Sequence, residues 1–325
     1  MKHIKFSNGD YMPSIGLGTW KASGTQVYES ITNAISLGYR HIDCAYIYQN
    51  EHDVGRAIAD ATMNNGLKRE DLWVTSKLWN SFHAPEDVLP ALRKSLADLR
   101  LNYLDLFLMH WPVAQKKEVV FPEAGADLIS LNEIPLHETW TAMEESVDNG
   151  LCRHIGVSNF SIAKLNSLRS KCRIKPEINQ VELHPYMQQT NMLDWCKVND
   201  IAVCAYSPLG SSDRPEWLIA PDEPHLLSDP VIAQIAREHQ CSSAQILIAW
   251  ALRRGTAVIP KSAGRVHLEE NYTAKDLLLS DEDMSRIGAI DKGRRYIRGE
   301  FWAIEGSPYT TKNLWDSEVE EPEAC

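Results

Sequence analysis

The sequence has no apolar run of the ~18–20 residues that a membrane-spanning helix needs. Its start, MKHIKFSNGD, lacks the apolar core and the small-residue cleavage site of a signal peptide. Positive charge is also scarce, because Asp and Glu outnumber Lys and Arg by 44 to 33 and the net charge is -11. General nucleic-acid affinity is therefore disfavoured. We expect a cytoplasmic protein with neither a membrane nor a nucleic-acid partner.

The seven cysteines form no CxxC pair and show no metal-finger spacing. Reduced, mostly buried thiols are the simplest interpretation, and we predict no metal site. Two nucleotide-binding motifs are missing as well. Gly16-Leu17-Gly18 begins a dinucleotide fingerprint, but Lys21 stands where the third glycine belongs, and there is no Walker P-loop. An open sheet of Rossmann type, the alternative to the fold chosen below, is therefore disfavoured.

Short apolar runs alternate with amphipathic stretches along most of the chain. Residues 3–14 predict a β-hairpin that turns at Asn8-Gly9. Helical spacing follows in four clear cases, at 26–37 (with Gly38 as its C-cap), 85–100, 137–149 and 242–254. Eight strand–helix units predict a single (β/α)8 TIM barrel over residues 1–325. The predicted strands are 14–19, 39–45, 72–77, 104–110, 154–158, 177–183, 201–206 and 257–261.

Two segments exceed the eight units. Residues 111–136 form a long loop after the fourth strand, and residues 294–325 form a C-terminal extension. Loops that follow barrel strands lie on the face where active sites are found, so we expect both near the mouth. The last residues, SEVEEPEAC at 317–325, are interpreted as a flexible, solvated acidic tail.

Three successive predicted strands end on an ionisable residue: Asp43, Lys77 and His110. Each has a structural interpretation, since Asp43 could cap a helix, Lys77 could reach water and His110 could be a core residue. Because the ends of parallel strands meet at one mouth, we expect the three side chains to come together. Tyr48 lies five residues after Asp43, although Tyr46 is an alternative to it.

These residue types indicate a proton-donating pocket. A free tyrosine, with a pKa of about 10, is a poor acid near neutrality. An ammonium group from Lys77 would favour the phenolate and lower that pKa. Asp43 would keep Lys77 charged and oriented, and His110 would hydrogen-bond a carbonyl oxygen. The four residues together would supply a proton to a developing alkoxide.

Eight segments carry a family resemblance: GLGTW, GYRHIDCA, LWVTSKLW, YLDLFLMHWP, IGVSNF, NQVELHPY, AYSPLGSSDR and IPKS. They resemble the aldo-keto reductases, and within them the monomeric aldehyde and aldose reductases, from the hairpin to about Tyr309. The resemblance implies NADPH-dependent reduction of aldehydes and some ketones, with Tyr48 as the proton donor. Sugar reduction of the aldose or xylose type is one alternative, and a non-catalytic, cofactor-binding regulatory barrel is another. Double-bond reduction on a steroid would need glutamate at His110.

The resemblance also implies where NADPH binds. Ser158, Asn159 and Gln180 would hold the carboxamide and Tyr206 would stack on the nicotinamide. Asp213 would pair with Lys21 and Lys261 to close a belt over the cofactor. The full predicted set is Thr19, Trp20, Lys21, Asp43, Ser158, Asn159, Gln180, Tyr206, Ser207, Leu209, Ser211, Asp213, Lys261, Ser262, Arg265, Glu270 and Asn271.

One position departs from the family pattern. Where an arginine usually stands six residues after the IPKS lysine, this chain has His267, and an arginine occurs at Arg265 instead. Arg265 would then reach the 2′-phosphate from a shifted position. We expect NADPH to be preferred, with weaker use of NADH.

Aromatic residues follow several strand ends and predict an apolar substrate pocket that favours apolar or aromatic aldehydes. Trp217, with Trp302 or Tyr309 from the C-terminal region, would close this pocket. Arg298 could favour aldehydes that carry a carboxylate. The predicted substrate-binding residues are Trp20, Tyr48, Trp79, His110, Trp111, Phe121 and Trp302.

Overall fold

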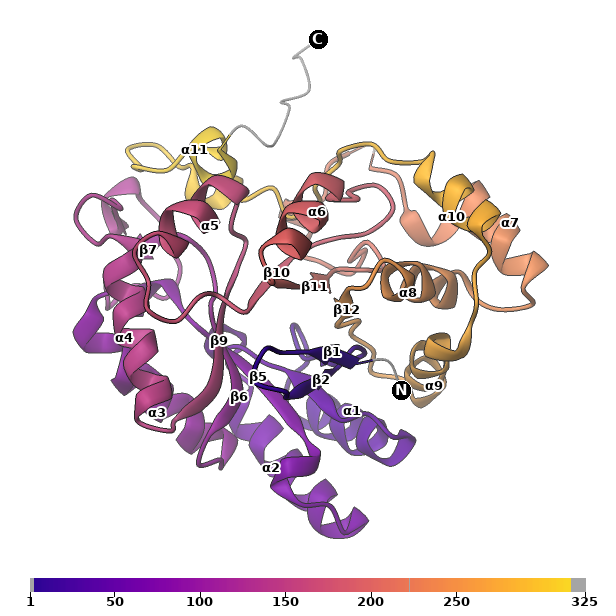
Figure 1. Ribbon diagram of the computed structural model, residues 1–325, viewed down its shortest axis with the longest axis horizontal. Coiled ribbons are helices and arrows are strands. Elements are labelled where there is room, and N and C mark those ends of the chain that lie inside the picture. The colour runs from indigo at the N-terminus through magenta and orange to yellow at the C-terminus, as the bar shows by residue number, and fades with distance from the viewer. Residues whose placement is uncertain (1–2, 222, 317–325) are drawn as a thin grey trace.

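Eight parallel strands form the sheet around which the chain is built (Figure 1). The computed structural model describes residues 3–221 and 223–316. Each strand of the sheet pairs with the next along the chain, and the isolated parallel bridge between Ile15 and Val258 joins the last strand to the first. The predicted TIM barrel is therefore confirmed. Its strands are β3 (Leu17–Gly18), β4 (His41–Asp43), β5 (Trp73–Leu78), β6 (Leu104–Met109), β9 (Cys152–Ser158), β10 (Ile178–Glu182), β11 (Ala202–Tyr206) and β12 (Ala257–Val258).

Helices surround the barrel, and their sequences explain their bounds. In α1 (Gly24–Leu37), Val27, Ile31 and Ala34 are buried at helical spacing, and Gly38 ends the helix at φ 105°, as predicted. A capping box between Ser242 and Gln245 begins α8 (Ser243–Arg253). The other helices of the ring are α2 (Glu51–Asn65), α3 (Pro85–Leu99), α4 (Leu136–Asp148), α5 (Ile162–Arg169), α6 (Thr190–Val198) and α9 (Arg265–Thr273).

Within residues 3–221 and 223–316, three further α-helices lie outside the eight strand–helix units: α7 (Pro230–Glu238), α10 (Asp281–Gly288) and α11 (Thr311–Trp315). None of them follows directly on a strand, so strand–helix alternation did not reveal them. The long loop after β6 contains an antiparallel pair, β7 (Ala114–Gln115) and β8 (Leu128–Ile129). The predicted acidic tail at 317–325 lies outside the described residues.

The predicted N-terminal hairpin closes one end of the barrel. Its strands, β1 (His3–Lys5) and β2 (Tyr11–Pro13), pair antiparallel. Phe6 and Met12 belong to the same buried cluster as Trp73, Leu106 and Ile178, which lie at or near the start of their strands. Because the hairpin fills this end, a ligand has to bind at the opposite end of the barrel.

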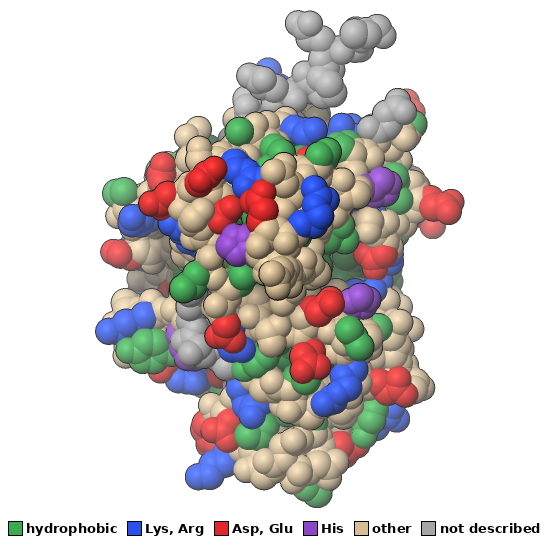
Figure 2. Space-filling model, turned by 90° about the vertical axis from the view of Figure 1, so that its right-hand side faces the viewer, with side chains coloured by type: hydrophobic (Ala, Val, Ile, Leu, Met, Phe, Trp, Pro, Cys, Tyr) green, Lys and Arg blue, Asp and Glu red, His purple; other side chains and the backbone are tan. Residues whose placement is uncertain are grey.

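Acidic and basic side chains are interspersed on the face that Figure 2 shows. Among the described residues, none of the helices combines the length and the apolar character that a membrane crossing requires.

Candidate active site

A cavity of about 660 Å³ opens at the carboxyl ends of the strands. Asp43 ends β4, Lys77 is the last residue but one of β5, and His110 follows β6 directly. Tyr48 ends the short 3₁₀ helix Tyr46–Tyr48, between β4 and α2. Asp43, Tyr48 and His110 line the cavity. The structure thus brings the predicted residues to one mouth, because parallel strands share their carboxyl ends.

Lys77 and Asp43 form a buried ion pair beneath the cavity. The Lys77 ammonium lies 2.5 Å from Asp43 Oδ1 and also donates to the carbonyl of Cys44 at 2.8 Å. The second carboxylate oxygen accepts from Gln180 Nε2 at 2.8 Å. Burial alone would lower the pKa of Lys77, but the Asp43 carboxylate raises it above its usual value. Lys77 is therefore held charged in a site from which water is excluded.

The Tyr48 ring lies close to both Lys77 and His110. Its centroid lies 5.2 Å from the Lys77 ammonium and 5.9 Å from the His110 ring. The sequence-based expectation that the Tyr48 pKa is lowered is wrong for this structure. Burial raises the pKa of Tyr48 to about 12, and Lys77 opposes that shift without reversing it. Tyr48 thus keeps its proton at neutral pH.

His110 is held as a neutral imidazole. Burial, and then the nearby Lys77 charge, lower its pKa well below the usual value. Among the described residues its Nδ1 has no hydrogen-bond partner, and its backbone carbonyl accepts from Asn159 Nδ2 at 3.0 Å. A neutral imidazole can donate one hydrogen bond into the cavity.

Polar side chains form the next part of the cavity wall. Ser158 and Asn159 line it at the end of β9, with Gln180 beside them on β10. The Tyr206 hydroxyl donates to Asn159 Oδ1 at 2.7 Å, which fixes the Tyr206 ring against this wall. Thr19 also lines the cavity and donates to the carbonyl of Asp43. Predicted residues that also line this wall are Trp20, Ser207, Leu209, Ser211, Asp213, Lys261 and Ser262.

Two lysines lie close to one carboxylate of the cavity wall. Asp213 Oδ2 lies 2.8 Å from Lys261 Nζ and 3.8 Å from Lys21 Nζ. Burial would raise the pKa of Asp213, but Lys261 lowers it below its usual value. The predicted Lys21–Asp213–Lys261 contact is thus present in the structure.

Four predicted cofactor residues do not line this cavity: Lys21, Arg265, Glu270 and Asn271. Arg265 Nη1 donates to Asn33 Oδ1 and Ser36 Oγ on α1, which directs its side chain away from the cavity in this structure. Arg265 begins α9, where polar groups of α1 are its nearest acceptors. Glu270 accepts from His267 Nδ1 at 3.1 Å instead.

The side of the cavity where we expected a substrate is aromatic. Trp20, Trp79, Trp111, Phe121 and Trp217 line it, as predicted from their positions after strand ends and in long loops.

Trp302 does not belong to this lining, which corrects the prediction. It is fully buried behind the wall, where its ring lies 5.4–5.8 Å from those of Trp79, Trp111 and Phe121. Phe301 faces the cavity instead. Phe301 and Trp302 are adjacent in a 3₁₀ helix of three residues, Glu300–Trp302, which is too short for a periodicity that could have told them apart.

The other C-terminal candidates have structural partners. The Tyr309 hydroxyl donates to the carbonyl of Ile129 and so supports the long loop. Arg298 lies 3.2 Å from Glu300 and is absent from the cavity lining. Sequence reasoning also missed Ile47, Gln49 and Ile297, which line the cavity from segments without a distinctive motif.

The donor groups of this cavity fit a nicotinamide dinucleotide. Ser158, Asn159 and Gln180 can form hydrogen bonds with a carboxamide in the same cavity as Tyr48 and His110. The Tyr206 ring provides a flat face on which a nicotinamide ring can stack. Lys261 and Ser262 supply a cation and a hydroxyl at the far part, where a phosphate can be held. The volume is within the range of cofactor sites.

Comparison with known proteins agrees with the family resemblance seen in the sequence. The model described as the Aldo/keto reductase family matches residues 14–292. The chain is 52% identical to Aldo/keto reductase slr0942 of Synechocystis over 97% of both chains. It is 45% identical to human Aldo-keto reductase family 1 member A1 over 90% of both chains. A solved structure of the aldose reductase from Schistosoma japonicum matches with a TM-score of 0.86 at 36% identity, covering 95% of this chain and 99% of the other.

Proposed function

This chain belongs to the aldo/keto reductase family, and from that premise we propose that it reduces aldehydes, and some ketones, to alcohols with NADPH. The observation that supports this most directly is the meeting of Tyr48, Lys77, Asp43 and His110 at the cavity floor. It joins a protonated phenol, a buried cation and a neutral imidazole around one space.

NADPH, when bound, supplies the hydride, and the chain's own residues manage the oxygen of the carbonyl. The Tyr48 hydroxyl and the His110 imidazole are both able to donate a hydrogen bond to that oxygen. As negative charge develops there, Tyr48 gives up its proton, because an alkoxide is a much stronger base than a phenolate. Lys77 then stabilises the Tyr48 phenolate, and Asp43 keeps Lys77 in place.

Cofactor choice is part of the proposal. Lys261 and Ser262 line the cavity and would hold the 2′-phosphate of NADPH. Arg265 points to α1, and His267 is paired with Glu270, so neither adds a second cation in this structure. We therefore propose that NADPH is preferred but that NADH is also used, more weakly.

The aromatic wall favours apolar or aromatic aldehydes over densely hydroxylated sugars. Arg298, which could have favoured carboxylate-bearing aldehydes, is paired with Glu300 outside the lining, so we propose no preference for a carboxylate.

The test is a screen for NADPH and NADH oxidation with benzaldehyde, hexanal, acetophenone and xylose. The expected order is aromatic and apolar aldehydes first, the ketone lower and xylose lowest, each faster with NADPH. Cofactor binding without oxidation by any carbonyl compound would favour a binding barrel instead. A preference for xylose would favour a sugar reductase.

A further inference from the structure

Two segments that are distant in the sequence both form the cavity wall. The loop after β11, residues 207–229 without residue 222, contributes Asp213 and Trp217. The C-terminal segment, residues 293–316, contributes Ile297 and Phe301. In the proposed function the loop covers the cofactor and the C-terminal segment walls the substrate. A contact between them would therefore connect two binding sites.

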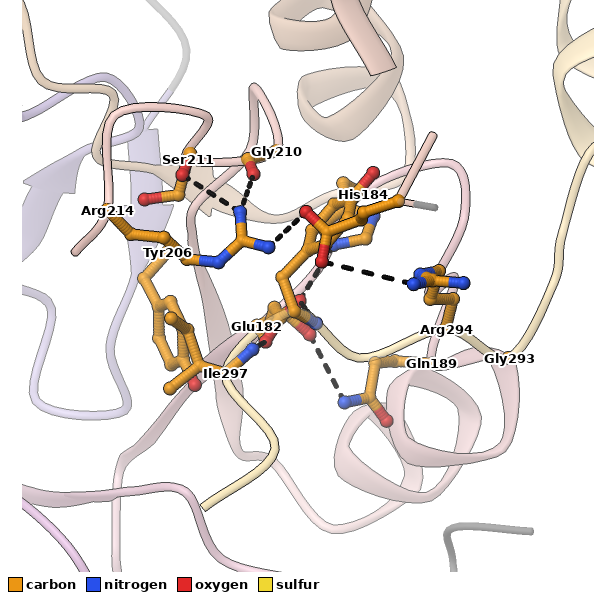
Figure 3. A network of polar contacts seen from close by, with 12 residues as sticks. Glu182, His184, Gln189, Tyr206, Gly210, Ser211, Arg214, Gly293, Arg294 and Ile297 are labelled. Carbon is orange, nitrogen blue, oxygen red and sulfur yellow. Dashed lines mark hydrogen bonds and ion pairs between the residues drawn. The ribbon is translucent and has the colours of Figure 1, made fainter. Parts of the chain in front are cut away.

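Arg214 holds the loop together from inside. It follows Asp213 in the chain and is itself only 3% exposed. Its guanidinium donates to the carbonyl of Ser211 at 3.1 Å and to that of Gly210 at 3.4 Å, and its Nε donates to the carbonyl of Leu218 at 3.1 Å. These bonds fix the turn that carries Asp213, as Figure 3 shows for Gly210 and Ser211.

The same guanidinium also reaches the C-terminal segment. Its central carbon lies 4.8 Å from the centroid of the Tyr296 ring, and Nη2 bonds the Glu223 carboxylate. The other oxygen of Glu223 lies 4.0 Å from Arg294, and the Tyr296 hydroxyl donates to the carbonyl of Pro224 at 2.8 Å. Arg214, Glu223 and Tyr296 thus connect the loop to the C-terminal segment.

Tyr296 is in turn anchored to the barrel. Its backbone N–H and that of Ile297 donate to the two oxygens of Glu182, at 2.6 and 2.8 Å. Burial would raise the pKa of Glu182, but the hydrogen bond from His184 lowers it below its usual value, which keeps the carboxylate a strong acceptor. Glu182 pairs in register with Tyr206 on β11, so this anchor lies beside the predicted cofactor wall.

On the basis of the proposed function, we propose that Arg214 is a positioning residue that couples cofactor binding to substrate binding. A buried guanidinium is stable only where its donors and charge are matched, and here the partners come from both segments. The position of Asp213 over the cofactor and that of Ile297 in the substrate wall therefore depend on one shared set of contacts. Ordering of one segment favours ordering of the other, which is positive coupling between the two sites.

The test is a double-mutant cycle with Arg214→Met and Tyr296→Phe. Tyr296 does not line the cavity, and the phenylalanine keeps the ring beneath Arg214 while removing the bond to Pro224. Arg298→Met is the matched control, because Arg298 lies on the same segment and forms its ion pair with Glu300. NADPH affinity is measured by quenching of tryptophan fluorescence, and KM and kcat are measured with benzaldehyde.

Tyr296→Phe is expected to raise both the Kd for NADPH and the KM for benzaldehyde by about two- to tenfold, the worth of one hydrogen bond, with a smaller change in kcat. Arg214→Met is expected to raise both by about ten- to a hundredfold, because it removes charge-assisted bonds. In the Arg214→Met background, Tyr296→Phe should no longer change the Kd for NADPH. Arg298→Met should leave both constants within about twofold, as exposed ion pairs contribute little.

Additive effects in the cycle, or a Tyr296→Phe effect confined to KM, would overturn the coupling. So would an equal effect of Arg298→Met. If circular dichroism shows that Arg214→Met does not fold, the Tyr296→Phe variant alone tests the coupling. If the contacts of Tyr296 were purely structural, Tyr296→Phe would leave the Kd for NADPH unchanged. A wild-type protein that neither binds NADPH nor reduces benzaldehyde would refute the proposed function as well, whereas an active wild type with additive variants refutes only the coupling.

Discussion

Replacing Lys77 by methionine separates the stability of the buried ion pair from its chemistry. Lys77 is fully buried with Asp43, and among the described residues the carboxylate keeps only the Gln180 donor once the ammonium is removed. Removing one partner of a buried pair costs about 3–5 kcal/mol of unfolding free energy, because the other charge is left uncompensated. Since a typical domain is stable by about 5–15 kcal/mol, the variant should still fold, at a lower urea midpoint.

The double variant Asp43→Asn/Lys77→Met tests this explanation. The amide oxygen introduced in place of the Asp43 carboxylate can still accept from Gln180 Nε2, and no unpaired charge remains. We expect the double variant to regain about 2 kcal/mol or more of the loss in Lys77→Met, because neutral partners of similar shape cost little. Neither variant should turn over substrate, since the ammonium beside Tyr48 is absent from both. Urea titration followed by tryptophan fluorescence gives the free energies.

Two results would refute this reasoning. The double variant could be less stable than Lys77→Met, or Lys77→Met could lose under about 1 kcal/mol; either would mean that the uncompensated charge is not the dominant cost.

Three further predictions concern the mouth and the closed end of the barrel. Tyr48→Phe should lower kcat by at least about a hundredfold, the usual size of general-acid catalysis, with the Kd for NADPH nearly unchanged; near-normal kcat would point to Tyr46 or His110 as the acid. Lys261→Met should weaken NADPH about ten- to a hundredfold and NADH little, whereas Arg265→Ala should leave the ratio of the two dissociation constants unchanged; direct titration of both cofactors decides this. At the closed end, burial would lower the pKa of His154, but hydrogen bonds with Glu177 and Asp10 raise it overall, so its contribution to stability is complete below the unfolded pKa of about 6.5 and is lost as pH rises through the higher folded value. The difference in unfolding free energy between wild type and His154→Gln should therefore shrink as pH rises, and a difference that is constant or grows would contradict this assignment.

The parts of the molecule that repeat regularly were predictable from the sequence. Apolar runs that end on Asp43, Lys77 and His110 predict a common mouth, because parallel strands place their carboxyl ends together. The direction of the Tyr48 pKa shift was not predictable from the sequence. It depends on whether the effect of burial, which raises the pKa, is larger than that of the Lys77 charge, which lowers it. Nor was the exchange of Trp302 for Phe301 at the wall.

Irregular segments account for the remaining differences. The orientation of Arg265 depends on Asn33 and Ser36, which lie more than two hundred residues earlier and meet it only after the barrel closes. The helices α7 and α10 follow loops rather than strands, so the alternation of strands and helices along the sequence does not predict them.

The N-terminal hairpin covers one end of the barrel, so a ligand can enter it from the opposite end. Phe6 and Met12 pack into the buried cluster at the amino ends of the strands, whereas the cavity lies at their carboxyl ends. The fold thus places residues that matter for stability and residues that matter for catalysis at opposite ends of the barrel. Substitutions near Phe6 and Met12 should change the melting temperature without changing turnover. The stability of the protein can therefore be raised at the hairpin end without disturbing the chemistry at the carboxyl ends of the strands.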